Sequence, residues 1–422
     1  MGDRQARIRP GGFTVNRILP FLILIILQPF ASDSSPSPRV KTGADLLLEK
    51  RPDILRGKRI GLITNQSGRL SSGEYLLDAL IARGIEVTAL FGPEHGIRGT
   101  EPAGESVPDS VDGKTQIPIF SLYGRIRKPT PAMLKNVDLL LFDIQDVGAR
   151  FYTYLSTLGL CMEAAAERGI PFVVLDRPNP LGGILTDGPV IPDSLRSFVG
   201  MFPLPVIYGL TIGELAAMAN GEGWLAGGVR AHLTVIPMEG WTRAMLWRHT
   251  GLPWIPPSPN IRRPETALVY PATCYLEATN ISEGRGTGDP FHLIGAPFID
   301  GRELAGVLSS EEMHGLRVRD VRFTPSASKF KGVACSGVSM EFTMSDSLRP
   351  VRIGLKILCS LKMSYPDSLV VNRRGLARLL GDPEALDLIS GGKSPSFIAG
   401  RWETALQTYR ERSSRYFIYP RK

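Results

Sequence analysis

The stretch Val137-Asp-Leu-Leu-Leu-Phe-Asp-Ile-Gln-Asp146 begins as an apolar run and stops abruptly at polar residues. Four other runs in the first half of the chain end in the same way. The five runs are Arg59 to Thr64, Val87 to Phe91, Ile117 to Leu122, Val137 to Phe142 and Phe172 to Leu175. Short runs that are apolar throughout are typical of strands buried on both faces of a parallel sheet.

Helical patterns separate these runs. Glu74 to Arg83 and Tyr154 to Arg168 have apolar residues at helical spacing, and Gly84 and Gly169 follow them as C-caps. Thr211 and Glu214 fit a capping box at the start of a further helix. This alternation predicts an α/β fold with a Rossmann-like, doubly wound parallel sheet.

The length of the chain predicts two domains, because 422 residues exceed one ordinary core. We expect the Rossmann-like catalytic domain over 40–257 and a smaller C-terminal α/β domain over 258–422. Within the second domain the patterns predict helices at Val351 to Met363 and Trp402 to Arg412, a strand at Val338 to Met344, and an ordered loop from Asn280 to Pro297.

The N-terminus has the order of a secretory signal. Arginines at 4, 7, 9 and 17 precede the apolar run Ile18 to Leu27, and Ala31-Ser32 open a polar stretch. That run is shorter than the roughly 20 residues of a membrane-spanning helix. We therefore expect a signal peptide over 1–32, a flexible Ser/Pro segment over 33–39, and export to the periplasm or the exterior. An uncleaved membrane anchor is the alternative.

Charge and cysteine usage exclude several functions. Loss of 1–32 removes four arginines and one aspartate, so the formal charge of +8 becomes +5, which suits work near an anionic cell wall. No basic patch interleaved with aromatic residues argues for nucleic acid.

The four cysteines are widely spaced, so zinc clusters are not expected, and Cys161 fits a buried small hydrophobe. A disulfide among the other three is permitted by export but unsupported by spacing.

Cofactor signatures are missing. The first run is followed by Thr64-Asn-Gln-Ser-Gly68, which lacks the G-x-G-x-x-G turn of dinucleotide-binding proteins. The five histidines are scattered without ligand spacing. We expect neither a cofactor nor a metal.

Carboxylates at the strand ends remain as candidate chemistry. The carboxyl ends of parallel strands share one edge, so Glu94, Asp143 and Asp146 are expected to converge there. Two acids at such an edge are the minimal equipment for glycoside cleavage. Each has a structural alternative: Glu94 could cap a helix or pair with Arg98, and Asp143 could be a buried acceptor that holds the edge.

The neighbouring residues also allow two interpretations. Asp176 and Arg177 could form an internal salt bridge, and Tyr152 and Tyr154 could be core aromatics or platforms for a sugar ring.

Six ordered motifs make the chain similar to a known family. They are Gly61-Leu-Ile-Thr-Asn-Gln66, Gly92-Pro-Glu-His-Gly-Ile-Arg-Gly99, Phe142-Asp-Ile-Gln-Asp-Val-Gly-Ala-Arg-Phe-Tyr-Thr-Tyr154, Leu175-Asp-Arg-Pro-Asn-Pro180, Pro257-Ser-Pro-Asn260 and Glu283-Gly-Arg-Gly-Thr287. From about Val40 to Tyr419 the chain resembles the exo-β-N-acetylmuramidases of glycoside hydrolase family 171, long catalogued as a family of unknown function. Gly286-Thr-Gly-Asp289 departs from the expected pattern, which leaves fine substrate preference open.

The resemblance implies an exported enzyme with a Rossmann-like domain and a smaller auxiliary domain. Its substrate would be the terminal N-acetylmuramic acid at the non-reducing end of peptidoglycan fragments. The family's proposed catalytic glutamate falls on Glu94, so Glu94 is the predicted general acid, with Asp143 or Asp146 as second carboxylate. Alternatively, the 2-acetamido group of the substrate serves as nucleophile and an Asp orients it.

The remaining predicted site residues would bind the sugar. They are Asn65, His95, Arg150, Tyr152, Asp176, Arg177, Asn179, Asn260, Glu283 and Arg285. One arginine, Arg177 before Arg150 and Arg285, would read the lactyl carboxylate, because a planar guanidinium suits bidentate pairing.

Two other functions fit the same residues. A non-catalytic peptidoglycan-binding protein would bind muramyl fragments without turnover. A nucleotide-dependent enzyme could use the same fold, since fold does not fix function.

Overall fold

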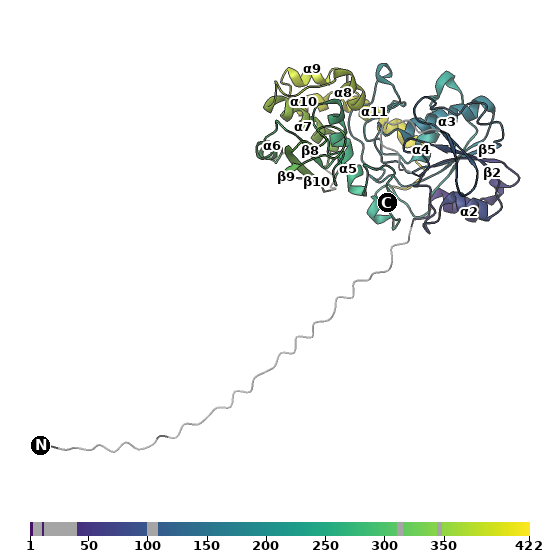
Figure 1. Ribbon diagram of the computed structural model, residues 1–422, viewed down its shortest axis with the longest axis horizontal. Coiled ribbons are helices and arrows are strands. Elements are labelled where there is room, and N and C mark those ends of the chain that lie inside the picture. The colour runs from purple at the N-terminus through teal and green to yellow at the C-terminus, as the bar shows by residue number, and fades with distance from the viewer. Residues whose placement is uncertain (3–10, 12–39, 99–108, 310–314, 344–347) are drawn as a thin grey trace. The chain divides into compact units, whose positions relative to one another are not determined.

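The first sheet contains, within the described part of the chain, seven strands in the order β3-β4-β2-β1-β5-β6-β7 (Figure 1). The computed structural model describes residues 1–2, 11, 40–98, 109–309, 315–343 and 348–422. The strands are β1 Ile60–Thr64, β2 Val87–Gly92, β3 Ser110–Val111, β4 Pro118–Ser121, β5 Leu139–Asp143, β6 Phe172–Leu175 and β7 Leu233–Ile236. The pairs are parallel except β3 with β4.

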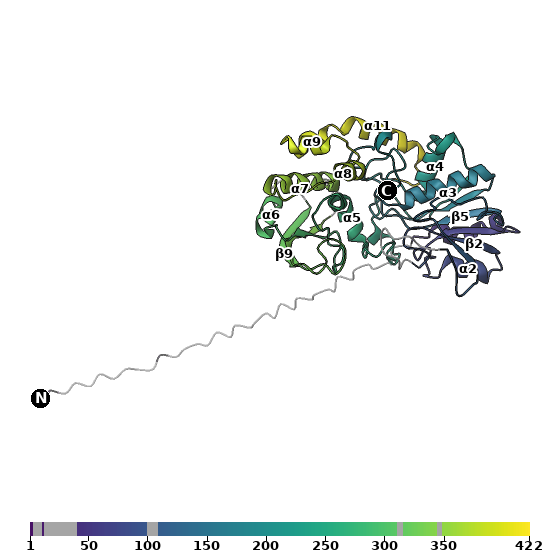
Figure 2. The ribbon, with the colours of Figure 1, turned by 45° about the horizontal axis from the view of Figure 1, so that its top comes forward.

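Both faces of this sheet are covered by helices. Ile63 and Phe142 point into a core shared with α3 (Tyr154–Arg168) and α4 (Ile212–Gly221). Leu62 and Leu141 point into a core shared with α1 (Gly43–Lys50) and α2 (Leu76–Ala82). Figure 2 shows α3 and α4 on one side of the sheet and α2 on the other. Alternate residues therefore meet apolar partners on both sides, which is why the runs are apolar throughout.

The predicted doubly wound sheet is confirmed. Each of the five predicted runs overlaps one of the strands, and β2 and β5 each extend one residue further. The capping box forms, since Thr211 Oγ1 accepts from the Glu214 N–H at 3.2 Å. Gly169 ends α3 with a left-handed φ of 65°. The edge strands β3 and β7 were not predicted.

A second sheet lies in the latter half of the chain. It is antiparallel, in the order β8-β10-β9, with β8 Leu293–Ala296, β9 Leu316–Phe323 and β10 Cys335–Phe342. The helices are α5 Pro264–Thr273, α6 Gly301–Leu308, α7 Pro350–Ser364, α8 Arg373–Leu380, α9 Ala385–Ser390, α10 Pro395–Gly400 and α11 Glu403–Ser413. A short 3-10 helix, η5 (Cys274–Ala278), follows α5. The two predicted helices are confirmed as α7 and α11, and the predicted strand is β10.

The prediction that Asn280 to Pro297 is a loop throughout is wrong at β8. This strand pairs with β10 where Gly295 faces Gly337, and a Cβ on Gly337 would lie only 2.0 Å from the Ile294 carbonyl oxygen. The two backbones approach too closely for side chains there. The strand β8 is only four residues long and includes Gly295, so its sequence lacks the pattern by which a strand is predicted.

The last residues of the chain return to the first sheet. The Tyr409 hydroxyl donates to the Tyr208 carbonyl at 2.6 Å, and the Ile418 N–H donates to Glu214 Oε1 at 2.9 Å. One apolar core also continues from α3 to α7. The domain boundary near residue 257 stays a prediction.

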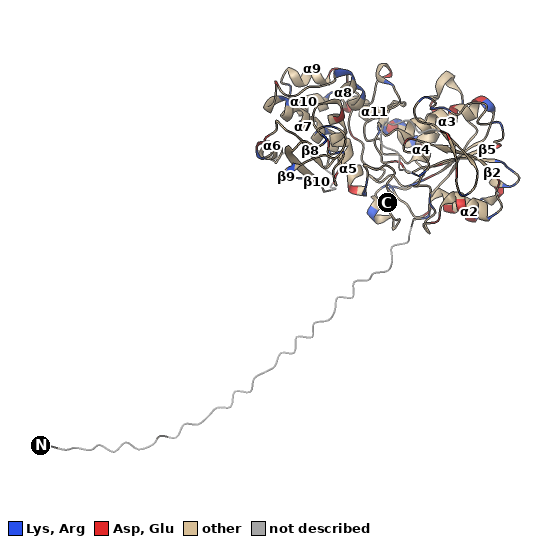
Figure 3. Cartoon of the chain, in the orientation of Figure 1, with Lys and Arg blue, Asp and Glu red and all other residues tan. Residues whose placement is uncertain are grey.

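The N-terminal predictions lie outside the described residues, except for residues 1, 2 and 11. Among the helices that the structure describes, none has the length and apolar character needed to cross a membrane. All four cysteines are buried with free thiols, and Cys161 is fully buried in an apolar core as predicted. Acidic and basic residues are interspersed along the backbone of both halves of the chain (Figure 3).

Candidate active site

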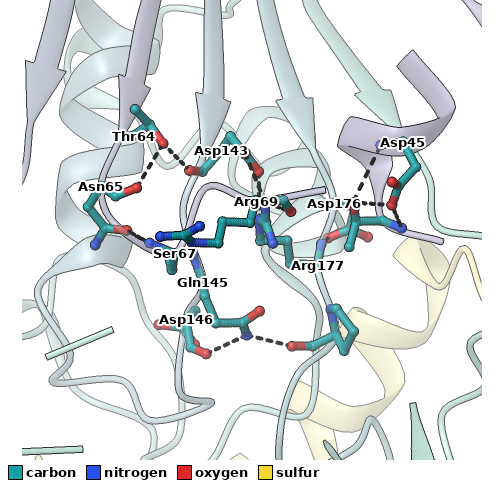
Figure 4. Close-up of polar contacts among 12 residues, drawn as sticks. Asp45, Thr64, Asn65, Ser67, Arg69, Asp143, Gln145, Asp146, Asp176 and Arg177 are labelled. Carbon is teal, nitrogen blue, oxygen red and sulfur yellow. Dashed lines mark hydrogen bonds and ion pairs between the residues drawn. The ribbon is translucent and has the colours of Figure 1, made fainter. Parts of the chain in front are cut away.

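Part of the predicted set lies at the carboxyl edge of the first sheet, the edge where its parallel strands end. Figure 4 shows Asn65, Asp143, Asp146, Asp176 and Arg177 there. Asn65 follows β1, Glu94 follows β2, Asp143 ends β5 and Asp176 follows β6. The strand order reverses at β1, which lies between β2 and β5. Ligands of open α/β sheets bind outside the strand ends at such a switch point.

Asp143 and Arg177 form a buried bidentate ion pair. Arg177 Nε and Nη2 donate to the two Asp143 oxygens at 2.6 and 2.9 Å, and the side chains are 0% and 5% exposed. Arg177 Nη2 also donates to the Arg69 carbonyl at 2.9 Å. Burial raises the pKa of Asp143, and the guanidinium opposes that rise. This geometry matches the alternative interpretation, in which Asp143 holds the edge together.

Asp176 binds α4 and the chain end. It accepts from Thr211 Oγ1 at 2.7 Å, from the Gly213 N–H at 2.8 Å and from the Tyr419 hydroxyl. Burial raises its pKa to about 6 despite these bonds. The ion-pair partner of Arg177 is therefore Asp143, and the predicted Asp176–Arg177 salt bridge is wrong.

Asn65 joins the edge to later segments. Its amide donates to the Tyr154 hydroxyl at 3.0 Å, and that hydroxyl donates to the Pro257 carbonyl at 2.6 Å. Its Oδ1 accepts from the Ser67 N–H at 2.9 Å. A fully buried amide with these partners fixes the loop after β1.

Glu94 lies in a turn directly after β2 and is half-buried. Its Oε2 accepts from Thr153 Oγ1 at 2.7 Å, and the Tyr123 hydroxyl also donates to the carboxylate. Burial and the Glu94 charge raise the pKa of Tyr123 to about 12. Residues 94–98 form turns rather than a helix, and Arg98 pairs with Asp112 at 2.5 Å. The two structural alternatives for Glu94, a helix cap and an ion pair with Arg98, therefore do not account for its hydrogen bonds with Thr153 and Tyr123.

His95 is buried beside Glu94 with a left-handed φ of 72°. Non-glycine residues adopt that conformation at a cost of about 1–3 kcal/mol and cluster at functional sites. The turn that presents Glu94 is thus held against a local backbone preference.

Asp146 is buried below the edge. Its Oδ2 accepts from the Gly148 N–H at 2.6 Å and from the Tyr208 hydroxyl. Its Oδ1 has no hydrogen-bond partner among the described residues. Burial raises the pKa of Asp146 to about 6, and the hydrogen bonds oppose this.

Asp146→Asn is expected to stabilise the protein near neutral pH and to leave its stability near pH 4 little changed. Since the folded pKa of about 6 lies above the unfolded one, the parent is most stable below about pH 4 and loses that contribution as pH rises through 6. Asn stays neutral and keeps an acceptor for Gly148. Urea unfolding should show a difference of up to about 3 kcal/mol above pH 7. A difference in the free energy of unfolding between parent and variant that stays constant with pH would contradict this.

Arg150 and Asn179 are engaged with backbone groups. Arg150 is 1% exposed and donates to the Pro189, Leu204 and Leu379 carbonyls at 3.0, 3.2 and 2.5 Å. Burial lowers its pKa to about 10. Asn179 donates to the Leu210 carbonyl at 2.8 Å and accepts from the Leu181 N–H at 3.0 Å. The structure places both inside the fold rather than on its surface.

The tyrosines after Arg150 belong to an aromatic cluster. The Tyr152 ring lies 4.6 Å from Tyr154 and 6.2 Å from Tyr270, both edge-on, and Phe291 lies 4.6 Å from Tyr270. Tyr152 and Tyr154 are 7% and 1% exposed. Their burial agrees with the core interpretation.

Two predicted residues of the second half form an ion network. Glu283 is 2% exposed and pairs with Lys329 at 2.9 Å and with Arg285 at 3.3 Å. Arg285 also pairs with Glu277 at 2.6 Å. Asn260 is half-buried, and its N–H donates to Ser258 Oγ at 3.2 Å.

Sequence reasoning did not single out Glu277, Tyr123 or Thr153. Thr153 and Tyr123 are found only through their contacts with Glu94. Glu277 follows no strand and lies in the short helix η5. Its only signal was an acid among the apolar residues of Cys274-Tyr-Leu-Glu-Ala278.

Both halves of the chain match one family. Residues 60–265 match exo-β-N-acetylmuramidase NamZ, N-terminal, and residues 268–419 match its C-terminal counterpart. The peptidoglycan β-N-acetylmuramidase NamZ of Bacillus subtilis (strain 168) is 46% identical over 390 residues, which span 92% of this chain and 93% of that protein.

Two crystal structures of DUF1343 family proteins from Bacteroides fragilis are similar in fold. One is 36% identical with a TM-score of 0.84, over 90% of this chain and 99% of that one. The other is 34% identical with a TM-score of 0.73, over 91% of this chain and 99% of that one.

Proposed function

The chain belongs to the exo-β-N-acetylmuramidase NamZ family, and from this membership we propose that it removes the terminal N-acetylmuramic acid from the non-reducing end of peptidoglycan fragments. It is a glycosidase homologous to a peptidoglycan β-N-acetylmuramidase at 46% identity. Beyond the glycosidase activity, the proposal specifies that cleavage occurs at the non-reducing end of the glycan, that Glu94 is the general acid, and that the protein is exported.

The position and hydrogen bonds of Glu94 support the mechanism best. Its carboxyl is half-buried in a turn at the carboxyl edge, beside the switch point between β1 and β5. Thr153 and Tyr123 orient it through hydrogen bonds. A carboxyl held in this way can give its proton to the glycosidic oxygen as the bond to C1 breaks.

The second carboxylate stays a prediction for Asp143 and Asp146. Asp143 uses both oxygens on Arg177 and is 0% exposed, so it would have to leave a bidentate pair to act on a substrate. Asp146 has one oxygen without a described partner, but it is only 5% exposed. Neither geometry favours direct contact with a sugar.

The lactyl carboxylate of muramic acid requires a cation within reach. Of the three predicted arginines, Arg177 and Arg150 are 5% and 1% exposed, whereas the Arg285 side chain is 21% exposed. Arg285 also uses Nε and Nη2 on its carboxylate partners, and its Nη1 forms no ion pair with the residues that the structure describes. The geometry therefore favours Arg285 over Arg177 for this role.

We expect an aryl β-N-acetylmuraminide to be cleaved at least about 10²-fold faster than the matching glucosaminide, because a site built for a charged group leaves its own charge unpaired when that group is absent. Arg285→Lys should reduce this ratio, and Arg302→Lys, at a side chain that is 90% exposed, should not. Chromogenic assays of both sugars provide the ratio. Equal rates on both sugars, or no muraminide cleavage at all, would refute the proposed function.

Export is part of the proposal. The run Ile18 to Leu27 behind four arginines supports a cleaved signal rather than an anchor. Intact mass of protein from its host should lack residues up to about Ser32. Retention of Ile18 to Leu27 would favour the anchor instead.

A further inference from the structure

The short helix η5 presents one carboxylate to solvent from an otherwise buried segment. Cys274, Tyr275, Leu276 and Ala278 are at most 7% exposed, whereas the Glu277 side chain is 32% exposed. A lone acid among buried residues has to be explained by its partners or by what it faces.

An ion network fixes the position of this carboxylate. Arg285 Nη2 binds Glu277 at 2.6 Å, and its Nε binds Glu283 at 3.3 Å. Lys329 binds the other Glu283 oxygen at 2.9 Å and also donates to the Leu276 carbonyl at 2.6 Å. Burying such charges adds little net stability, so the network is better explained by the geometry it imposes. What it positions at its more exposed end is Glu277, whose pKa is raised by burial while the Arg285 guanidinium opposes that rise.

The helix η5 that carries Glu277 and the turn that carries Glu94 both contact the segment Phe151 to Tyr154. On one side, the η5 residue Tyr275 lies 6.0 Å from the Phe151 ring, and Tyr270 lies 5.0 Å from it. On the other side, Thr153 holds Glu94 at 2.7 Å. The segments that carry the two carboxylates thus come from different halves of the chain and contact neighbouring residues, Phe151 and Thr153.

Tyr123 links the two carboxylates electrostatically. Its hydroxyl donates to Glu94, and the charge of Glu277 also reaches it. Burial is the main cause that raises the pKa of Tyr123 to about 12; the charge and hydrogen bond of Glu94 add to it, and the charge of Glu277 adds least. Tyr123 thus lies within the field of both acids.

We propose that Glu277 is the second catalytic carboxylate, a role that rests on the glycosidase function proposed above. Glu94 gives its proton to the leaving oxygen while the C1–O bond breaks toward that oxygen. Glu277, paired with Arg285, takes a proton from the water that forms the new C1–O bond on the opposite face. The product is the α-anomer of N-acetylmuramic acid, and Glu94 and Glu277 exchange protons with solvent to restart the cycle.

Glu277→Ala tests this role. We expect a loss of about 10²–10⁴-fold in kcat, both on a muramyl disaccharide and on an aryl muraminide, because attack by water needs the base whatever group leaves. Azide, a nucleophile that needs no base, should restore turnover of the aryl substrate and give a muramyl azide. Glu277→Gln keeps a partner for Arg285 and should show the same loss without rescue, while Glu303→Gln, at an exposed site on α6, should match the parent.

Several results would overturn the inference. They are a folded Glu277→Ala protein within tenfold of the parent, a loss confined to the disaccharide, a loss without azide rescue, or a β-anomer as the first product seen by NMR. Failure of the parent protein to release N-acetylmuramic acid would instead refute the proposed function. Melting temperatures of both Glu277 variants show whether either substitution unfolds the protein.

Discussion

Glu94→Gln is expected to slow the release of N-acetylmuramic acid from a muramyl disaccharide by about 10²–10⁴-fold, because Gln keeps the size of the side chain but cannot donate an acidic proton. Thr153 can still donate to the Gln carbonyl oxygen, so the turn should survive. KM should change little. The measurement is kcat and KM on the disaccharide, with the melting temperature alongside.

A change of leaving group makes this test specific. A nitrophenolate leaves without prior protonation, so the loss on a nitrophenyl muraminide should be much smaller than on the disaccharide. Glu86→Gln is the matched control, since Glu86 is exposed at the opposite, amino end of β2. A Glu94→Gln protein that is folded and cleaves the disaccharide near the parent rate would remove Glu94 as the general acid.

The sequence was informative where burial alone decides the structure. Runs such as Leu139-Leu-Leu-Phe142 are apolar on every residue because helices cover both faces of the sheet, so the pattern does not depend on the partner strand. β7 is different: Leu233 to Val235 are only partly covered at the edge of the sheet. β8 depends on a glycine pair between strands, which no local pattern encodes.

The site could be predicted only as far as strand ends determine it. Topology places Asn65, Glu94, Asp143 and Asp176 on one edge, but it does not assign partners. Arg177 pairs with Asp143, which is distant in sequence, rather than with its chain neighbour Asp176. The reason is that β5 and β6 are adjacent, with Phe142 beside Val174, so Asp143 ends next to the start of the Asp176–Arg177 loop. Glu277 lies outside this rule because its position depends on tertiary contacts of η5.

The Asp143–Arg177 pair gives the largest expected effect on stability. Arg177→Met should lower the free energy of unfolding by about 3–5 kcal/mol, because it leaves the Asp143 carboxylate buried without its counter-charge. Asp143→Asn leaves the guanidinium buried and should cost a similar amount. Urea unfolding followed by tryptophan fluorescence measures both.

A double-mutant cycle separates the ion pair from general damage at this position. The Asp143→Leu and Arg177→Met double variant buries no charge, so it should be less destabilised than the sum of the losses of the Asp143→Leu and Arg177→Met single variants. Arg373 and Asp387 provide the matched control, since they also form a bidentate contact, through Nη1 and Nη2 at 2.7 and 2.8 Å, with side chains that are 58% and 64% exposed. Asp387→Asn should change stability little, as exposed pairs do. Additive losses in the cycle, or single losses no larger than that of Asp387→Asn, would show that the buried pair does not hold the edge. If Asp143→Asn stays folded in stabilising buffer and cleaves the disaccharide near the parent rate, Asp143 supports the site without taking part in the chemistry.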